Sequence, residues 1–208
     1  MILVIETATA ACSVALIENH VVIASFHELV GRGHAERLIP MIASLPGGGR
    51  ADSILVGCGP GSFTGIRVGV AAAKGLALAW DIQACGYATH ALLAGHYFAH
   101  SIDAVNKDDD IMVATEAGHG QVFVQSYASN PFGPASPLTS LPPEDAASLC
   151  QTPVILGSAA RALVSLRGWG RAVTSAPDAR YAVALPNGYA DLPVMPIYGR
   201  DADAKRPL

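Results

Sequence analysis

The sequence predicts an α/β fold in which one structural unit occurs twice. Residues 54–79 read as a buried strand, a loop rich in glycine and proline, and a long helix. An apolar strand at 111–116 then restarts the pattern found at 2–7, and the strands and helices after it repeat the order of the first half. We therefore expect a first lobe at residues 1–104 and a shortened, irregular second lobe at residues 105–208.

The first lobe begins with apolar segments that have the length and composition of strands. Its predicted elements are strands at 2–5, 12–17 and 21–26, a helix at 34–45, a strand at 54–56, a helix ending near 79, a strand at 84–87 and a helix at 89–98. The second lobe is predicted to have strands at 111–116, 121–127 and 154–156, with helices at 144–149 and 158–166. After residue 170 the pattern becomes irregular.

The helix that ends near residue 79 has one face almost without side chains. Gly65, Gly69, Ala73 and Ala77 are four residues apart and fall on one ridge. Glycine inside a helix costs about 1 kcal/mol relative to alanine, so two on one ridge need a structural reason. That reason is the close approach of another backbone, which belongs either to this chain's own core or to a partner chain.

The glycine-rich loop before this helix does not match the phosphate-binding or nucleophile motifs that it superficially suggests. No Walker sequence occurs, and the third glycine of a dinucleotide fingerprint counted from Gly59 falls on Thr64. The nucleophile position of a serine-hydrolase elbow after Gly61 is Phe63. What remains is a helix N-terminus, with Ser62 and Thr64 as candidate caps.

Composition limits the classes of protein that the chain can represent. It has 208 residues, of which 51% are hydrophobic and only 14% charged, whereas ordinary soluble domains have about 25% charged residues. This shortage of charge indicates that some apolar surface is covered by another subunit. The net charge of −4 gives no indication of a dominant basic surface for nucleic acid.

Cysteines and hydrophobic runs indicate a cytoplasmic protein. The four cysteines are scattered without a Cys-x-x-Cys pair, which favours reduced thiols over disulfides or a zinc site. The N-terminus has no basic region of the kind that begins a signal peptide and includes Glu6. Lys74 interrupts the longest apolar run, so no membrane-spanning segment is expected.

Three segments resemble the bacterial TsaB (YeaZ) family in order and spacing. They are MILVIETATAACSVAL at the start, HAERLIPMI from His34, and GCGPGSFTGIRVGVAAAKGLALA from Gly57. The resemblance is dense in the first half of the chain and thin in the second. It implies two similar α/β lobes of the actin-like, Hsp70-like and sugar kinase (ASKHA) type, which agrees with the duplication read from the strands and helices.

The resemblance also implies a role in modifying tRNA. A TsaB-type chain is a non-catalytic subunit that pairs with a TsaD-type catalytic subunit and works with a TsaE-type ATPase. Together they attach a threonylcarbamoyl group to the adenosine next to the anticodon of certain tRNAs. On this basis the metal and ATP with Mg²⁺ belong to the partner subunits, and this chain has no cofactor. We expect a homodimer when the chain is alone, and contact with tRNA only through the complex.

Histidines at two places resemble metal-binding patterns but are incomplete. In the TsaD-type relative two histidines four residues apart bind the metal, whereas this chain has His34 followed by Leu38. Three protein ligands or more are needed, so no metal is expected here. His96 and His100 are also four apart on a predicted helix, but no third ligand is evident and we expect a solvated helix face.

Two classes of function follow from these patterns. In the leading hypothesis the chain is an assembly subunit whose helices form, or buttress, an interface with a TsaD-type subunit or with a second copy of the chain, and Gly69→Leu should block pairing. The predicted interface residues are Leu38, Met41, Ile42, Gly65, Arg67, Gly69 and Ala73. The alternative is a small-molecule kinase or ATPase of the same fold, or a glycoprotease-like peptidase. The carboxylates and hydroxyls available for a weak nucleotide site are Glu6, Thr7, Thr9 and Glu116.

Overall fold

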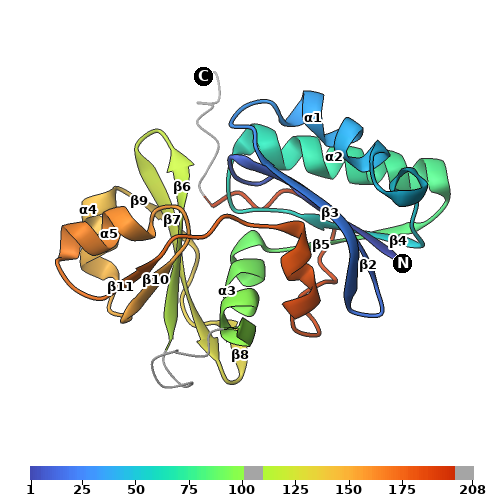
Figure 1. Cartoon of the computed structure of the whole chain (residues 1–208). Helices are drawn as coiled ribbons and strands as arrows, with labels where there is room; N and C mark the ends of the chain where they lie inside the picture. Colours follow the sequence, from blue (N-terminus) through green and yellow to red (C-terminus); the bar gives the residue numbers. More distant parts are fainter. Residues whose placement is uncertain (101–109, 200–208) are drawn as a thin grey trace, which may run out of the picture.

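The computed structural model describes residues 1–100 and 110–199 and contains two β-sheets. In the first sheet the strand order is β3-β2-β1-β4-β5, where β1 pairs antiparallel with β2 and parallel with β4 (Figure 1). The strands are β1 (Ile2–Glu6), β2 (Ala11–Glu18), β3 (Val21–Leu29), β4 (Ser53–Gly57) and β5 (Gln83–Tyr87). All five were predicted, although β3 is longer than expected because it continues its pairing with β2 to Leu29.

Helices cover both faces of this sheet. Alternate residues of a strand point to opposite faces, so Leu3 and Ile5 pack under α1 (His34–Ala43) and α2 (Phe63–Trp80). Val4 faces the other side, where α3 (Thr89–His100) and the 3₁₀ helix η2 (Ala179–Ala184) lie. A short 3₁₀ turn, η1 (Pro46–Gly49), follows α1.

The second sheet repeats the first. Its order is β11-β10-β6-β7-β8, again with a central strand paired antiparallel to the next strand and parallel to a later one. The strands are β6 (Ile111–Gly118), β7 (Gln121–Ser129), β8 (Phe132–Pro134), β9 (Thr139–Leu141), β10 (Val154–Leu156) and β11 (Arg171–Val173). The helices α4 (Pro143–Leu149) and α5 (Ala160–Arg167) cover one face. The duplicated ASKHA-type fold expected from the sequence is therefore confirmed.

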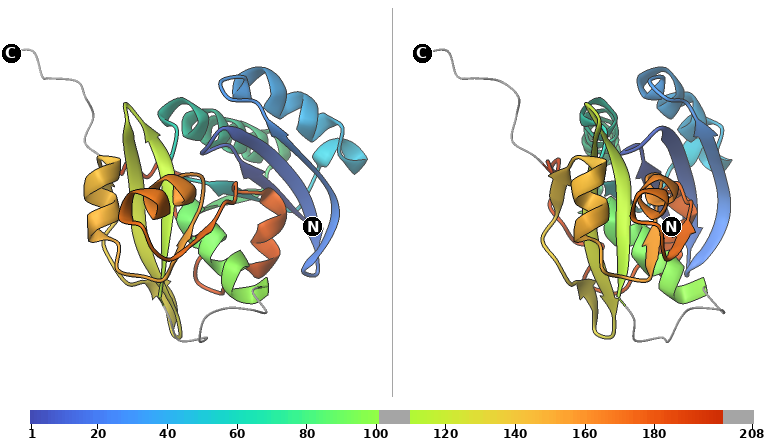
Figure 2. Two further views of the ribbon diagram at one scale, coloured as in Figure 1. Left: turned by 60° about the vertical axis from the view of Figure 1, so that its left-hand side comes forward. Right: turned by 90° about the vertical axis from the view of Figure 1, so that its left-hand side faces the viewer.

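Helix α3 lies between the two sheets and belongs to the core of both (Figures 1 and 2). Leu92 packs against the first sheet, whereas Leu93 and Tyr97 pack against the second. The helix is buried on two sides, and for this reason its sequence is apolar nearly all round.

The C-terminal region differs from the prediction of irregular structure after residue 170. The chain forms β11 at the edge of the second sheet and then returns to the first lobe, where η2 packs against β1, β2 and β3. Beyond η2, Leu192 pairs with Gly86, and the Ile197 amide donates to the Cys58 carbonyl at 2.7 Å. The predicted boundary between residues 104 and 105 lies outside the described residues.

The central strand–loop–helix unit forms as predicted. Ser62 caps α2, since its hydroxyl accepts a hydrogen bond from the Gly65 amide at 3.2 Å. The helix ends at Asp81, which adopts a left-handed conformation with φ of 56°. In the described part of the chain, no helix combines the length and apolar character needed to cross a membrane.

Candidate functional site

A cleft of about 690 Å³ lies between the two lobes. The first lobe contributes Thr9 from the β1–β2 turn, Arg32 after β3, and Phe63 at the start of α2. The second lobe contributes Glu116 at the end of β6 and Ser158 before α5. The cleft is therefore large enough for a small ligand and combines polar and apolar walls.

Only two of the four residues predicted for a nucleotide site reach this cleft. Thr9, in the turn after β1, and Glu116, on β6, line it. Glu6 and Thr7 are fully buried instead. The prediction that all four share one site is therefore wrong, because the β1–β2 turn directs Glu6 and Thr7 into the protein interior.

The Glu6 carboxylate is enclosed by hydrogen-bond donors. One oxygen accepts from the Ala8 amide at 2.7 Å, and the other accepts from the Thr89 hydroxyl at 3.1 Å. Gly57 on β4 lies directly against this carboxylate, where a Cβ atom would overlap it. Burial raises the pKa of Glu6, and the hydrogen bonds from Ala8, Tyr87 and Thr89 oppose that shift. Glu6 therefore links the end of β1 to the first residue of α3 inside the protein.

We expect Glu6→Gln to change how stability depends on pH. The folded chain holds the Glu6 proton to a higher pH than the unfolded chain, so the wild type loses stability as pH rises above the ordinary value of 4.5. Glutamine has no such proton. The variant should therefore gain stability relative to the wild type as pH rises, by about 1.4 kcal/mol for each unit by which folding raises the pKa. Urea unfolding of both chains across this pH range measures the difference, and a constant difference would contradict the prediction.

The small-residue ridge of α2 packs inside the chain. The Thr7 hydroxyl donates to the Gly65 carbonyl at 2.8 Å, so the end of β1 lies against the helix backbone. A Cβ atom on Gly65 would overlap the Thr7 carbonyl, and one on Gly69 would overlap the Thr7 hydroxyl. The ridge therefore provides the space in which β1 and α2 approach, which was one of the two explanations left open by the sequence.

The prediction of a partner interface is consequently wrong for most of its residues. Six of its residues are buried within this chain, namely Leu38, Met41, Ile42, Gly65, Gly69 and Ala73. They form the core between the first sheet and its two outer helices, and no partner can contact them while this fold persists. The apolar stripe and the glycine ridge were read correctly as packing faces, but the surface that they pack against belongs to the same chain.

Arg67 is the one predicted interface residue that is exposed. Its guanidinium lies 3.6 Å from the centroid of the Phe63 ring, and its Nε–H donates to the Tyr198 hydroxyl at 3.1 Å. Phe63 and Tyr198 are themselves in contact, with ring centroids 4.9 Å apart. Arg67 is thus held in an aromatic cluster on the surface, beside the mouth of the cleft.

The outer surfaces of α1 and α2 remain exposed beside each other (Figures 1 and 2). Ile39 on α1 is 50% exposed and Leu78 on α2 is 86% exposed. Two small residues of α2, Ala71 and Gly75, are also exposed. No atom lies within 4 Å of the position that a Cβ atom on Gly75 would take. We call Ile39, Ala71, Gly75 and Leu78 the outer helix face.

His34, the one histidine of the incomplete metal-binding pattern at the start of α1, has a structural role. Nε2 of His34 lies 2.8 Å from the Thr9 carbonyl and 3.2 Å from that of Ala11, and because a carbonyl only accepts, Nε2 is protonated. Leu38 is in the core. Within residues 1–100 and 110–199, no three His, Cys, Asp or Glu side chains are grouped to hold a metal ion. Whether the chain binds a metal stays a prediction.

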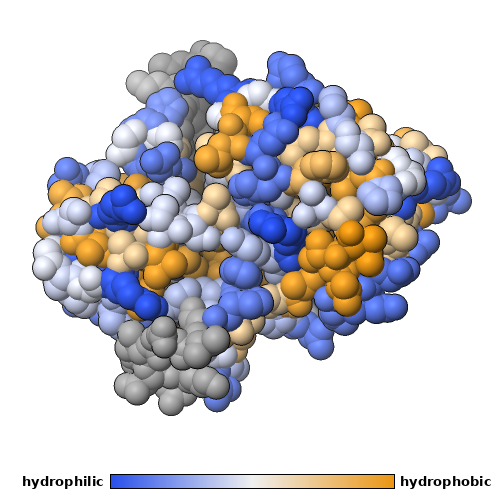
Figure 3. Space-filling model, viewed as in Figure 1, coloured by the Kyte–Doolittle hydropathy of each residue, from blue (hydrophilic) through white to orange (hydrophobic). Residues whose placement is uncertain are grey.

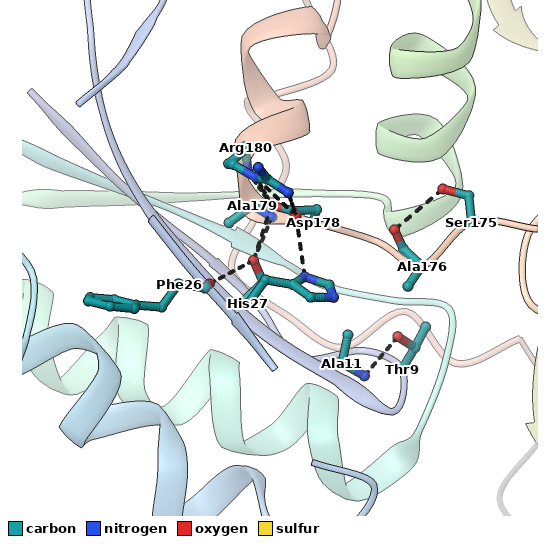
Figure 4. A network of polar contacts seen from close by, with 10 residues as sticks. Thr9, Ala11, Phe26, His27, Ser175, Ala176, Asp178, Ala179 and Arg180 are labelled. Atoms are coloured by element: carbon teal, nitrogen blue, oxygen red, sulfur yellow. Dashed lines mark hydrogen bonds and ion pairs between the residues drawn. The ribbon is translucent and has the colours of Figure 1, made fainter. Parts of the chain in front are cut away.

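A polar network that the sequence analysis missed fastens the C-terminal segment to the first sheet (Figure 4). Asp178 is buried and accepts two hydrogen bonds from the Arg180 side chain at 3.0 Å and 2.7 Å through one oxygen. The other oxygen accepts from Ser13 on β2 at 3.3 Å, and His27 on β3 lies 3.3 Å from Asp178. The sequence contains a signal for this network, because Asp178 after Pro177 is a typical N-cap residue and caps η2.

Comparison with known proteins supports the resemblance. The family described as "TsaD: tRNA N6-adenosine threonylcarbamoyltransferase" matches residues 24–130. The chain is 37% identical over 131 residues to the Escherichia coli tRNA threonylcarbamoyladenosine biosynthesis protein TsaB, covering 61% of this chain and 54% of that protein. It is 31% identical over 217 residues to an uncharacterised Mycobacterium tuberculosis protein, covering 98% and 93% respectively.

A solved structure extends the likeness over nearly the whole fold. YeaZ from Pseudomonas aeruginosa superposes with a TM-score of 0.74 and 26% identity, covering 95% of this chain and 98% of that one. The match to the curated TsaB relatives from E. coli and Haemophilus influenzae spans only about half of their length. Sequence, fold and family match agree, and the chain belongs to the TsaB (YeaZ) family.

Proposed function

We propose that this chain is the non-catalytic subunit of a tRNA threonylcarbamoyladenosine-forming complex and that it pairs with a TsaD-type catalytic subunit. The observation that carries the proposal is the outer helix face, a set of exposed small and apolar residues on two helices that pack against each other. Small residues let a second pair of helices approach closely, and exposed leucine and isoleucine supply apolar area for burial.

The interior of the first lobe supports a non-catalytic role. Glu6, at the end of β1, is enclosed in the protein and accepts hydrogen bonds from the Ala8 amide and the Thr89 hydroxyl. Leu38 stands where the TsaD-type relative has its second metal ligand, and its side chain fills the core under α1. Leu38 is thus used for packing and Glu6 for joining β1 to α3. We infer that the chain acts by binding a partner.

The pairing surface proposed here replaces the one read from the sequence. It keeps the same two helices but uses their opposite side, since the glycine ridge and the apolar stripe are internal. On this lobe Figure 3 shows apolar surface mainly over β2 and β3, where Val21 and Ile23 are exposed, whereas the exposure of Ile39 and Leu78 is that of their side chains on α1 and α2. The same face would serve a second copy of the chain when no partner is present, and a TsaE-type ATPase and tRNA would join through the complex in the cytoplasm.

Gly75→Leu tests this proposal. The variant should fold normally, because nothing lies within 4 Å of the added Cβ, but a leucine on the outer helix face should keep the partner's helices apart. We expect the affinity for the TsaD-type subunit of the same organism, followed by co-purification, to fall about 5- to 150-fold, the effect of overpacking by about 1–3 kcal/mol. Ala162→Leu, a similar change on the exposed side of α5, is the control and should bind normally.

Two results would contradict the surface or the role. Equal binding by wild type and Gly75→Leu would exclude the outer helix face as the interface. Absence of any complex between the wild-type chain and the TsaD-type subunit would exclude the role itself.

The cleft between the lobes favours an alternative function, nucleotide binding. Thr9 and Glu116 face a space of about 690 Å³ from opposite lobes, and carboxylate oxygens are the ligands that Mg²⁺ prefers. Titration of the isolated chain with Mg·ATP separates the two functions. Tight binding with turnover would favour a kinase or ATPase.

A further inference from the structure

A separate cavity of about 270 Å³ lies beside the last turns of α3, away from the cleft. One wall is α3, and the other is the edge of the second sheet with the segment that follows β11. Leu93, Leu156 and Val173 give it an apolar lining. This cavity therefore lies where the chain leaves the second lobe, and we call it the Arg171 cavity.

Arg171 presents a positive charge to this cavity. Its Nη2 donates to the Tyr97 hydroxyl at 2.5 Å, which fixes the guanidinium near α3. In the part of the chain that the structure describes, Arg171 makes no ion pair, and no carboxylate lines the cavity. A guanidinium offers a planar fork of donors that suits phosphate and carboxylate groups, so an anion is the expected occupant.

Two histidines of α3 add nitrogen atoms. Nδ1 of His96 is buried and has no hydrogen-bond partner among the described residues, while its ring stacks on Tyr181 with centroids 3.6 Å apart. Nδ1 of His100 donates to the His96 carbonyl at 3.0 Å, and Nε2, the other nitrogen of the ring, does not take part in that hydrogen bond. The expectation of a plain solvated helix face is therefore wrong for His96, because η2 covers it.

His96 is uncharged at neutral pH, whereas Arg171 in the same cavity is positively charged. Burial lowers the pKa of His96 to about 4, and the neighbouring His100 and Arg180 act in the same direction while Asp178 opposes them. His96 is consequently a neutral donor or acceptor at pH 7. Thr174 and Ser175 bring hydroxyl groups from the segment after β11.

We propose that the Arg171 cavity binds a small phosphate monoester. The phosphate lies on Arg171, with the hydroxyl groups of Thr174 and Ser175 and the exposed His100 ring as further partners. The organic part lies against Leu93, Leu156 and Val173. The volume, at the low end for ligand pockets, limits the organic part to a few atoms or one small ring. Since α3 and β11 form opposite walls, the ligand joins the central helix to the edge of the second lobe.

Calorimetric titration of the full chain with phenyl phosphate at pH 7 tests the proposal. We expect saturable binding that weakens at least about tenfold in Arg171→Gln, since a hydrogen bond to a charged group contributes 1.5–3 kcal/mol. Arg161→Gln, which removes an exposed arginine of α5, is the matched control and should bind as the wild type does. Circular dichroism establishes that each variant is folded.

Further arms of the titration distinguish the ligand classes. His96→Phe keeps a ring to stack on Tyr181 and removes a buried Nδ1 that has no hydrogen-bond partner among the described residues, so we expect binding equal to that of the wild type and thermal stability that is equal or higher. Benzoate, with fewer oxygens and less charge, should bind more weakly than phenyl phosphate. Equal binding of benzoate would overturn the phosphate assignment. Absence of saturation by about 10 mM phenyl phosphate, or equal affinity in Arg171→Gln, would overturn the site.

Discussion

Gly69→Leu is expected to destabilise the protein strongly, whereas Gly75→Leu on the same helix is expected to leave it as stable as the wild type or more so. A side chain at Gly69 would overlap the Thr7 hydroxyl and press on Val56 of β4. Overpacking costs 1–3 kcal/mol or more, and loss of the hydrogen bond from Thr7 to Gly65 adds about 1 kcal/mol. We therefore expect a loss of about 2–4 kcal/mol, a large part of the 5–15 kcal/mol typical of folded domains.

Gly75→Leu provides the matched control. It introduces the same side chain where no atom lies within 4 Å and replaces a helical glycine, which is worth up to about 1 kcal/mol in helix propensity. Urea unfolding followed by circular dichroism compares the two variants. Equal stability would show that the ridge is not packed against the β1–β2 turn. The pair also separates folding from partner binding, since loss of a complex by Gly69→Leu alone would report only misfolding.

Asp178→Ala is expected to release the C-terminal segment from the first sheet. The carboxylate holds Arg180, Ser13 and His27, which come from η2, β2 and β3. Hydrogen bonds to a charged group contribute 1.5–3 kcal/mol, and Arg180 regains water because about half of its side chain is exposed. We expect a loss of about 2–3 kcal/mol in the free energy of unfolding at neutral pH.

The effect of Asp178 should depend on pH in a defined direction. Burial alone would raise its pKa, but hydrogen bonds from Arg180 outweigh burial and lower it below the ordinary value of 3.8. The contribution of Asp178 is thus present above that value and is lost as pH falls through the lower pKa of the folded state. Asp191→Ala, an exposed change in the same segment, is the control. A loss equal for both variants would contradict a specific role for Asp178.

Local patterns in the sequence were sufficient for the elements of the first lobe. The apolar run at Ile54–Val56, the cap at Ser62 and the amphipathic stripe of α1 depend on neighbours close in the chain, and each was read correctly. The duplication was also readable, because the order of elements is itself local information. The short strands β8, β9 and β11 were missed, since three residues are too few to show a period.

Contacts between distant parts of the chain explain the errors at the candidate site. A ridge such as Gly65 and Gly69 shows that something packs closely, but only the fold identifies that neighbour as Thr7. Glu6 was placed correctly at a strand end, yet its enclosure depends on Thr89 in another element. The link between Asp178 and Ser13 joins residues that are 165 positions apart, and no periodicity reports such a pair.

The most direct test of the proposed role is reconstitution of the tRNA modification. The TsaD-type and TsaE-type subunits of the same organism, and the enzyme that makes the donor of the threonylcarbamoyl group, are mixed with tRNA. Threonylcarbamoyladenosine in the digested tRNA is then measured by mass spectrometry. The account predicts modification with the wild-type chain, and little or none when it is omitted or replaced by folded Gly75→Leu. Equal modification without the chain, or modification by the chain in the absence of the TsaD-type subunit, would contradict it.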